Sequence, residues 1–244
     1  MNKVLLTSVI AVANLVTVPA FSKSGFDGFY VGASAGYSSL DAQKKTDYIQ
    51  STIGSPTYNI NSDTKSNNAS GAISFGYAHQ YNAMYMAYEL NSLFDHHSTK
   101  TNYSDPGDLN MTETLERNWA FGLNFHPGLY LNDKTVIYGK IGLSISKFKY
   151  KAQGRAEYGG GADIVDFSQG HNKSLWGFTV GTGIRTELSE SCSFIAEVFH
   201  TTYQKYKTPT LIENWNDGGP REEKIISRMK PRNTHFTVGL NVKI

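Results

Sequence analysis

Eight segments of the sequence alternate apolar and polar residues, and this alternation constrains the fold more than any other feature. Successive side chains of a β-strand point to opposite faces, so each segment would have one apolar and one more polar face. Proline lacks the amide that a strand ladder needs, so Pro127 predicts a bulge or local break in the fourth segment. The predicted strands are about 28–38, 68–78, 84–94, 118–131, 135–148, 173–188, 192–203 and 233–244.

The connections between these strands alternate between long and short. The short gaps lie near residues 79–83, 132–134 and 189–191, and the long gaps lie near 39–67, 95–117, 149–172 and 204–231. Short turns on one side and long loops on the other are typical of up-and-down barrels in outer membranes. The sequence therefore predicts an all-β fold, an eight-stranded antiparallel up-and-down transmembrane β-barrel.

A secreted β-sandwich or a lipocalin-like barrel would also show alternation. Here, however, glycine and serine crowd the polar faces, where a soluble surface would carry lysine and glutamate. Tyrosine and tryptophan recur near the strand ends, as in the aromatic belts of membrane proteins. Both features favour the membrane barrel.

The first 22 residues have the pattern of a secretory signal peptide. Lys3 supplies a positive start, residues 4–16 form an apolar run, and Ala20 and Ser22 are small residues at a suitable spacing for cleavage after Ser22. The run is shorter than the roughly 20 apolar residues of a spanning helix. The predicted organisation is a signal peptide at 1–22 and an outer-membrane β-barrel domain at 23–244.

Charge and cysteine content exclude several classes of protein. The formal net charge of +2 lacks the basic excess of a nucleic-acid-binding protein. Cys192, the single cysteine, excludes an internal disulfide and a cysteine-based metal cluster. Asp95-His96-His97 is a weak metal motif, because adjacent histidines seldom converge on one ion without further ligands. We expect no cofactor.

Four segments carry a resemblance to a known family: Gly28–Tyr37, Tyr138–Gly142, Ala196-Glu197 and Phe236–Ile244. In them the chain resembles the small outer-membrane β-barrels of Gram-negative bacteria, of the opacity-protein, OmpA and OmpX type. The resemblance implies a place in the bacterial outer membrane and a last strand that the barrel-assembly machinery recognises. The residues of this assembly signal would be Phe236, Val238, Leu240, Val242 and Ile244. The family usually ends in an aromatic residue, and Ile244 departs from that.

Four charged residues fall on the inward face of the predicted strands: Glu89, Lys140, Arg185 and Glu197. Unpaired charges in a narrow interior are costly, so two acids and two bases would form a neutral cluster. The arrangement resembles the interior of OmpA-type barrels. The cluster would act either as a static plug or as a gate whose acids exchange basic partners; we favour the plug.

The predicted loops hold most of the remaining charge. The second long loop is acidic, with Asp95, Asp105, Asp108, Glu113 and Glu116. The fourth is basic, with Lys205, Lys207, Arg221, Lys224, Arg228, Lys230 and Arg232. Basic groups at the rim could bind phosphates of lipopolysaccharide or a sulphated host glycan.

Enzymatic activity has weak support from the sequence. A hydrolase would need a nucleophile, a base and an orienting acid. His200 with Thr201 or Thr202 is the nearest candidate, but Glu197 would lie on the opposite side of the wall.

The sequence therefore predicts a non-enzymatic outer-membrane barrel that displays four long extracellular loops, for envelope integrity and for surface adhesion or host interaction. A narrow porin-like channel gated by the interior charges is the alternative, and a lipid A-modifying enzyme is less favoured. Expected partners are outer-membrane lipid and lipopolysaccharide, the barrel-assembly machinery, and a host surface receptor or glycan; nucleic acid is not expected.

Overall fold

The computed structural model describes residues 25–50, 58–104, 109–158, 163–216 and 219–244, and almost all of them are in strands. None of these residues forms a helix long and apolar enough to cross a membrane. The predicted signal peptide lies outside the described residues. The strands are β1 (Gly28–Gln50), β2 (Tyr58–Tyr81), β3 (Met84–Ser104), β4 (Leu109–Asn132), β5 (Thr135–Tyr158), β6 (Asp163–Glu187), β7 (Cys192–Tyr203), β8 (Tyr206–Asn216) and β9 (Gly219–Lys243).

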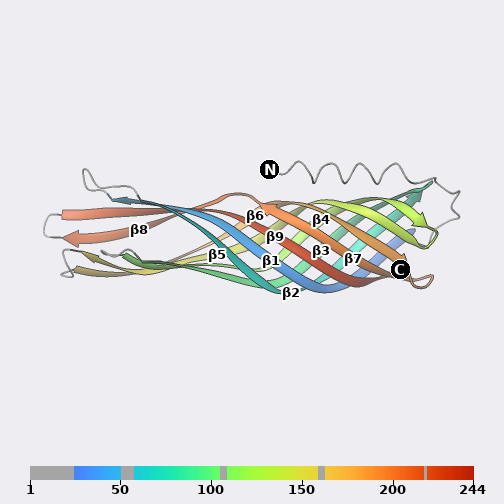
Figure 1. Cartoon of the computed structure of the whole chain (residues 1–244), viewed down its shortest axis with the longest axis horizontal. Coiled ribbons are helices and arrows are strands. Elements are labelled where there is room, and N and C mark those ends of the chain that lie inside the picture. The colour runs from blue at the N-terminus through green and yellow to red at the C-terminus, as the bar shows by residue number, and fades with distance from the viewer. Residues whose placement is uncertain (1–24, 51–57, 105–108, 159–162, 217–218) are drawn as a thin grey trace.

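The strands form one closed antiparallel sheet (Figure 1). Each strand from β1 to β6 pairs with the next, β7 pairs with β9, and β9 pairs back with β1. β7 and β8 both pair with β9, at Arg232–Val242 and at Gly219–Met229. β8 therefore continues the course of β7 after a break at residues 204–205, and the barrel has eight strand positions. The predicted fold class is confirmed.

The short connections are confirmed and lie together at one end of the barrel (Figure 1). Two-residue turns at 82–83 and 133–134 join β2 to β3 and β4 to β5, and residues 188–191 join β6 to β7. Asn82 has a φ of 54°, in the left-handed region that asparagine tolerates better than most residues.

The outer surface next to these turns carries a belt of exposed apolar side chains, as predicted for a wall that faces lipid. Leu143 is 54% exposed and Ile73 is 61% exposed. β7 alternates less regularly in sequence, and an inward Glu197 predicts Ile195 and Phe199 inside and Val198 outside. In the structure Ile195, Glu197 and Phe199 are buried and Val198 is exposed. Other members of the belt include Phe29, Tyr37, Phe75, Leu90, Phe94, Phe121, Trp176, Val180, Phe236 and Leu240.

The prediction of four long loops is wrong for most of their length. Residues 39–50, 58–67, 95–104, 109–117, 149–158, 163–172, 206–216 and 219–231 are in strands, which form an extension of the barrel beyond the belt. On β5 the buried apolar side chains of the extension occupy even positions, Phe148, Tyr150 and Ala152, whereas the lipid-facing ones are Leu143 and Ile145. The apolar face changes sides because the wall of the extension has water outside and protein inside.

The extension consists of two four-stranded sheets (Figure 1). β2 pairs with β3 only from Ser70 toward the turns, and β6 pairs with β7 only from Gly177 toward the turns. Beyond these points β8, β9, β1 and β2 form one sheet, and β3, β4, β5 and β6 form the other. An apolar core fills the space inside the extension: Leu40, Ala42, Leu115, Phe148, Tyr150, Ala152, Leu175, Tyr203, Tyr206 and Met229.

β4 has a local break at Pro127 but no bulge there. Its ladder with β5 is interrupted at residues 126–127, as predicted, although the register is the same on both sides, at Phe125–Ile141 and Gly128–Tyr138. The register shifts between Tyr130 and Asn132, and between Arg117 and Ala120, where one extra residue changes which side chains face inward. Asn118 is therefore exposed, although its alternation with Trp119 and Phe121 in the sequence predicts an inward side chain.

Candidate functional site

The interior of the barrel is stacked in layers, and the layer nearest the short turns is aromatic. Arg185 lies within it, with its guanidinium carbon 4.5 Å from the ring centre of Tyr30 and 4.9 Å from that of Phe26. Arg185 also donates hydrogen bonds to the hydroxyls of Tyr85 (3.1 Å) and Ser193 (2.8 Å). The layer comprises Phe26, Tyr30, Ala78, Tyr85, Ala87, Tyr130, Val136 and Tyr138.

The next layer holds three charges in direct contact. Lys140 Nζ lies 2.8 Å from Glu197 Oε2 and 3.3 Å from Glu89 Oε1. Tyr138 donates to Glu197 Oε1 at 2.9 Å, and Tyr30 donates to Glu89 Oε2 at 3.2 Å. All five side chains are at least 94% buried. Each carboxylate thus keeps a cationic partner and a hydroxyl donor, which is what a buried ion needs.

The structure brings together three of the four residues of the predicted charge cluster. Arg185 makes no ion pair with a described residue; its guanidinium lies over the ring of Tyr30, whose hydroxyl donates to Glu89, and it donates a hydrogen bond to the hydroxyl of Tyr85. His126, which faces inward as expected, adds a ring 3.9 Å from Glu89 Oε1 and stacked on Tyr138.

A second charged layer, which the sequence did not reveal, lies on the extension side of the first. Asp95 is at its centre: Oδ1 is 3.3 Å from Arg117 Nη2, and Oδ2 is 3.2 Å from His97 Nε2 and 3.8 Å from His235 Nε2. Asn233 donates to the same Oδ2 at 3.2 Å. The expectation that Asp95 lies in an acidic loop is wrong, and Arg117 was missed because the bulge in β4 reverses which of its residues face inward. The sequence signal that could have placed Asp95 inside is the alternation of inward and outward residues on β3, which continues without interruption through Asp95 and His97.

This second layer does not resemble a metal site. Asp95 and His97 are fully inside, whereas His96 is exposed and contacts Asn118. In the described part of the chain, no three His, Cys, Asp or Glu side chains are arranged to hold a metal ion.

A third ion pair lies within the extension. Lys44 contacts Glu113, which also accepts hydrogen bonds from Tyr150 (2.5 Å) and Ser227 (2.6 Å). Burial lowers the pKa of Lys44 to about 7, while the Glu113 carboxylate beside it favours the charged ammonium. Glu113 is therefore an interior residue and not part of an acidic surface loop.

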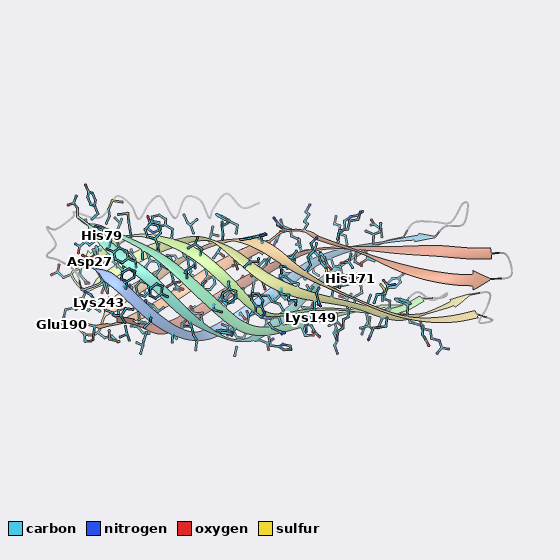
Figure 2. All side chains as sticks on the ribbon, turned by 180° about the vertical axis from the view of Figure 1, so that it is seen from behind. Asp27, His79, Lys149, His171, Glu190 and Lys243 are labelled. Carbon is cyan, nitrogen blue, oxygen red and sulfur yellow. The ribbon has the colours of Figure 1, made fainter. Side chains whose placement is uncertain are left out.

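Little space is left between these layers. Cavities beside Lys140 and beside Lys44 each have a volume of about 10 Å³, room for about one water molecule. A larger hollow of about 620 Å³ lies at the short-turn end, among Lys134, Glu190 and Lys243. Figure 2 shows Glu190 and Lys243 at that end, with Lys149 and His171 beyond the belt on the side of the extension.

Most of the remaining predicted residues lie on the surface or outside the described residues, but Thr201 is buried and lies 2.9 Å from Thr179 Oγ1. His200 faces outward and contacts Thr234 Oγ1 at 2.9 Å, so it lies on the opposite side of the wall from Glu197, as expected. Asp105 and Asp108 are outside the described residues, and the side chains of Arg221 and Lys224 are not described. Lys205, Lys207 and Arg228 are exposed, and Lys230 and Arg232 are half-buried.

The predicted assembly signal forms one continuous apolar row. All of its side chains are exposed on the outward face at the end of the chain: Phe236, Val238, Leu240, Val242 and Ile244. Lys243 alternates with Val242 and Ile244, which predicts an inward side chain, but it is exposed at the mouth of the barrel.

The chain is similar to several solved structures. OprG from Pseudomonas aeruginosa is similar in structure, with a TM-score of 0.50, 14% identity, and coverage of 91% of this chain and 99% of that one. Neisserial surface protein A matches with a TM-score of 0.39, 17% identity and coverage of 91% and 98%. Ail from Yersinia pestis matches with a TM-score of 0.29, 12% identity and coverage of 86% and 99%.

These identities are too low to show more than the fold, and no curated protein sequence matches the chain. The model of the family described as "Outer membrane protein beta-barrel domain" matches residues 8–243. The chain therefore belongs to the outer-membrane β-barrel family, and its closed wall with an apolar belt is a transmembrane barrel of the bacterial outer membrane.

Proposed function

We propose that this protein is a non-enzymatic surface-display barrel with a closed lumen, which supports envelope integrity and presents its extension for adhesion or contact with a host. The observation that carries the proposal is the extension itself. Barrels of this class carry their short turns on the periplasmic side and their longer connections outside the cell. The extension would therefore project from the cell surface.

The extension is suited to holding its tips away from the membrane. β5 runs for twelve residues beyond the belt, from Lys147 to Tyr158, which corresponds to roughly 36 Å along the strand. An interior core and the Lys44–Glu113 pair tie its two sheets together. A structure of this kind would hold the far ends of the described strands away from the membrane.

The packed interior supports a static plug in place of a gated pore. A passage would have to cross an aromatic layer, two charged layers and the apolar core of the extension, and the cavities beside Lys140 and Lys44 hold about one water each. In planar bilayers the refolded protein should conduct little. Discrete conductance steps that change with Glu89→Gln would support the channel instead.

Each proposed partner corresponds to one part of the protein surface. The belt contacts outer-membrane lipid, basic residues beyond it contact lipopolysaccharide, and the apolar row at the end of β9 is the signal for the barrel-assembly machinery. The tips would meet a host receptor or glycan.

Adhesion can be tested by shortening the tips without disturbing the barrel. Asp47 pairs with Asn59, and Ala152 pairs with Gln169. Residues 48–58 and 153–168 can therefore each be replaced by a two-residue Asn-Gly turn with the register kept and the core of the extension intact.

We expect the double-deletion variant to assemble normally and to lose adhesion to host cells. The matched control replaces the same residues with Gly-Ser segments of equal length, which keeps the chain length but removes the native tips. Unchanged adhesion of the double-deletion variant would contradict the adhesion proposal.

A further inference from the structure

Three lysines follow the lipid-facing side chains of β5 without a break. Ile145 is the last apolar residue on this face, and Lys147, Lys149 and Lys151 occupy the next three outward positions, all exposed. Alternate residues place these ammonium groups along a line of roughly 13 Å. Figure 2 shows Lys149 on the side of the extension, beyond the wide part of the barrel.

Few acidic side chains of the protein lie beside these lysines to balance their positive charge. None of the three forms an ion pair with a described residue. Their cross-strand neighbours on the same face are Ser174, Asn172 and Gly170 on β6, and Glu116 and Thr114 on β4. One acid therefore accompanies three bases, and the serine, threonine and asparagine side chains add neutral hydrogen-bond donors.

The basic residues of β9 are different. Arg228 is paired with Asp47, and Arg232 lies opposite Asp41 on the neighbouring strand. The positive charge of β9, which the sequence analysis assigned to a basic fourth loop, is thus partly neutralised by acids of β1, whereas the positive charge of the three lysines on β5 is not.

We propose that Lys147, Lys149 and Lys151 form a binding site for the phosphate groups of lipopolysaccharide in the surrounding outer leaflet. The argument is one of position. The face that contacts acyl chains up to Ile145 continues directly into the lysines, so Lys147 lies where the hydrocarbon ends and the phosphates of the glycolipid begin. Lys149 and Lys151 then face the layer above. Ammonium groups bind phosphate through charge-assisted hydrogen bonds.

This proposal deepens the lipopolysaccharide contact proposed above and rests on the outer-membrane location, not on adhesion. Its test compares two variants of the refolded protein that lose the same charge. The first is K147Q/K149Q/K151Q. The matched control is K45Q/K65Q/K100Q, three exposed lysines of the extension on three different strands. The probes are purified lipopolysaccharide, the same material with its phosphates removed, and heparin as a soluble sulphated glycan.

We expect the first variant to bind lipopolysaccharide about tenfold more weakly than the unmodified protein, equivalent to about 1.4 kcal/mol. The control variant should stay within about twofold. Removing the phosphates should weaken binding by the unmodified protein to the level of the first variant, and should not weaken that variant further.

Equal losses in the two variants would overturn the proposal, because they would show a general effect of net charge. Undiminished binding of the dephosphorylated material by the unmodified protein would also overturn it. If the first variant lost heparin binding but kept lipopolysaccharide binding, the site would belong to a soluble glycan. Tip deletion leaves these lysines in place, so the adhesion assay can fail while this one succeeds.

Discussion

Replacing Lys140 tests how dry the barrel interior is. Lys140 is 2% exposed, and it is the cation within 3.3 Å of both Glu89 and Glu197. Lys140→Met keeps an unbranched side chain that is one heavy atom shorter, but it leaves two buried carboxylates facing each other without the ammonium group that lies between them and over the Phe199 ring. Breaking a buried ion pair from one side costs about 3–5 kcal/mol. We expect a loss of free energy of unfolding in that range.

A triple variant separates the charge effect from the packing effect. Glu89→Gln and Glu197→Gln keep an oxygen that accepts the hydrogen bonds of Tyr30 and Tyr138 while removing both negative charges. Combined with Lys140→Met, they should restore stability to within about 1 kcal/mol, because a buried ion pair is often replaced by neutral side chains at little cost.

The assay is equilibrium unfolding by guanidinium chloride in lipid vesicles, followed by tryptophan fluorescence. Lys151→Met is the matched control: it makes the same change on the same strand, but at an exposed position, and should alter stability by less than about 0.5 kcal/mol. If Lys140→Met behaved like Lys151→Met, the carboxylates would be hydrated and the packed interior refuted. Failure of the triple variant to recover would show that shape, and not charge, explains the loss.

Two further predictions concern the wall. Leu143→Arg places a charge on the lipid face and should destabilise the barrel in vesicles by about 2–4 kcal/mol, or block assembly. Ser144→Arg should instead fail through crowding in the interior, in detergent as well as in lipid. Equal tolerance of both in an assembly assay would mean that the faces are wrongly assigned. Gly183→Ala brings a Cβ within 2.6 Å of the Tyr138 ring and should lower the free energy of unfolding by about 1–3 kcal/mol. Gly170→Ala, whose added Cβ has its nearest neighbour 3.7 Å away, should lower it by less. The opposite order would contradict the packing of the aromatic layer.

The inward and outward faces within the membrane could be predicted from the sequence because lipid imposes one rule on every strand. Leu143 and Val238 must be apolar because they face acyl chains, and their neighbours Ser144 and Thr237 are small and polar because they line the interior. On β7 the outward residues Phe194 and Val198 follow this rule, although Ile195 and Phe199 on the inward face are large and apolar. The same reasoning placed Glu89, Lys140 and Glu197 inside, although it did not show that Arg185 stacks on aromatic rings.

The extension could not be predicted in this way, because the rule reverses where the lipid ends. On β1 the outward apolar residue Tyr37 is followed by inward Leu40 and Ala42. A search for one constant apolar face stops at that change and assigns the residues beyond it to a loop. The inward position of Arg117 was not predicted for a second reason: a one-residue bulge leaves no reliable mark in the sequence.

Cysteine accessibility along β5 tests most directly whether the strands continue beyond the membrane around a packed interior. On a Cys192→Ser background, single cysteines from position 143 to 152 would be exposed on intact cells to a water-soluble maleimide. We predict that cysteines at positions 147, 149 and 151 react.

Cysteines at positions 148, 150 and 152, whose side chains point inward, should stay unreacted, as should those at the lipid-facing positions 143 and 145. Uniform labelling of positions 147–152 would contradict the account, because it would mean that a solvated loop begins where the belt ends.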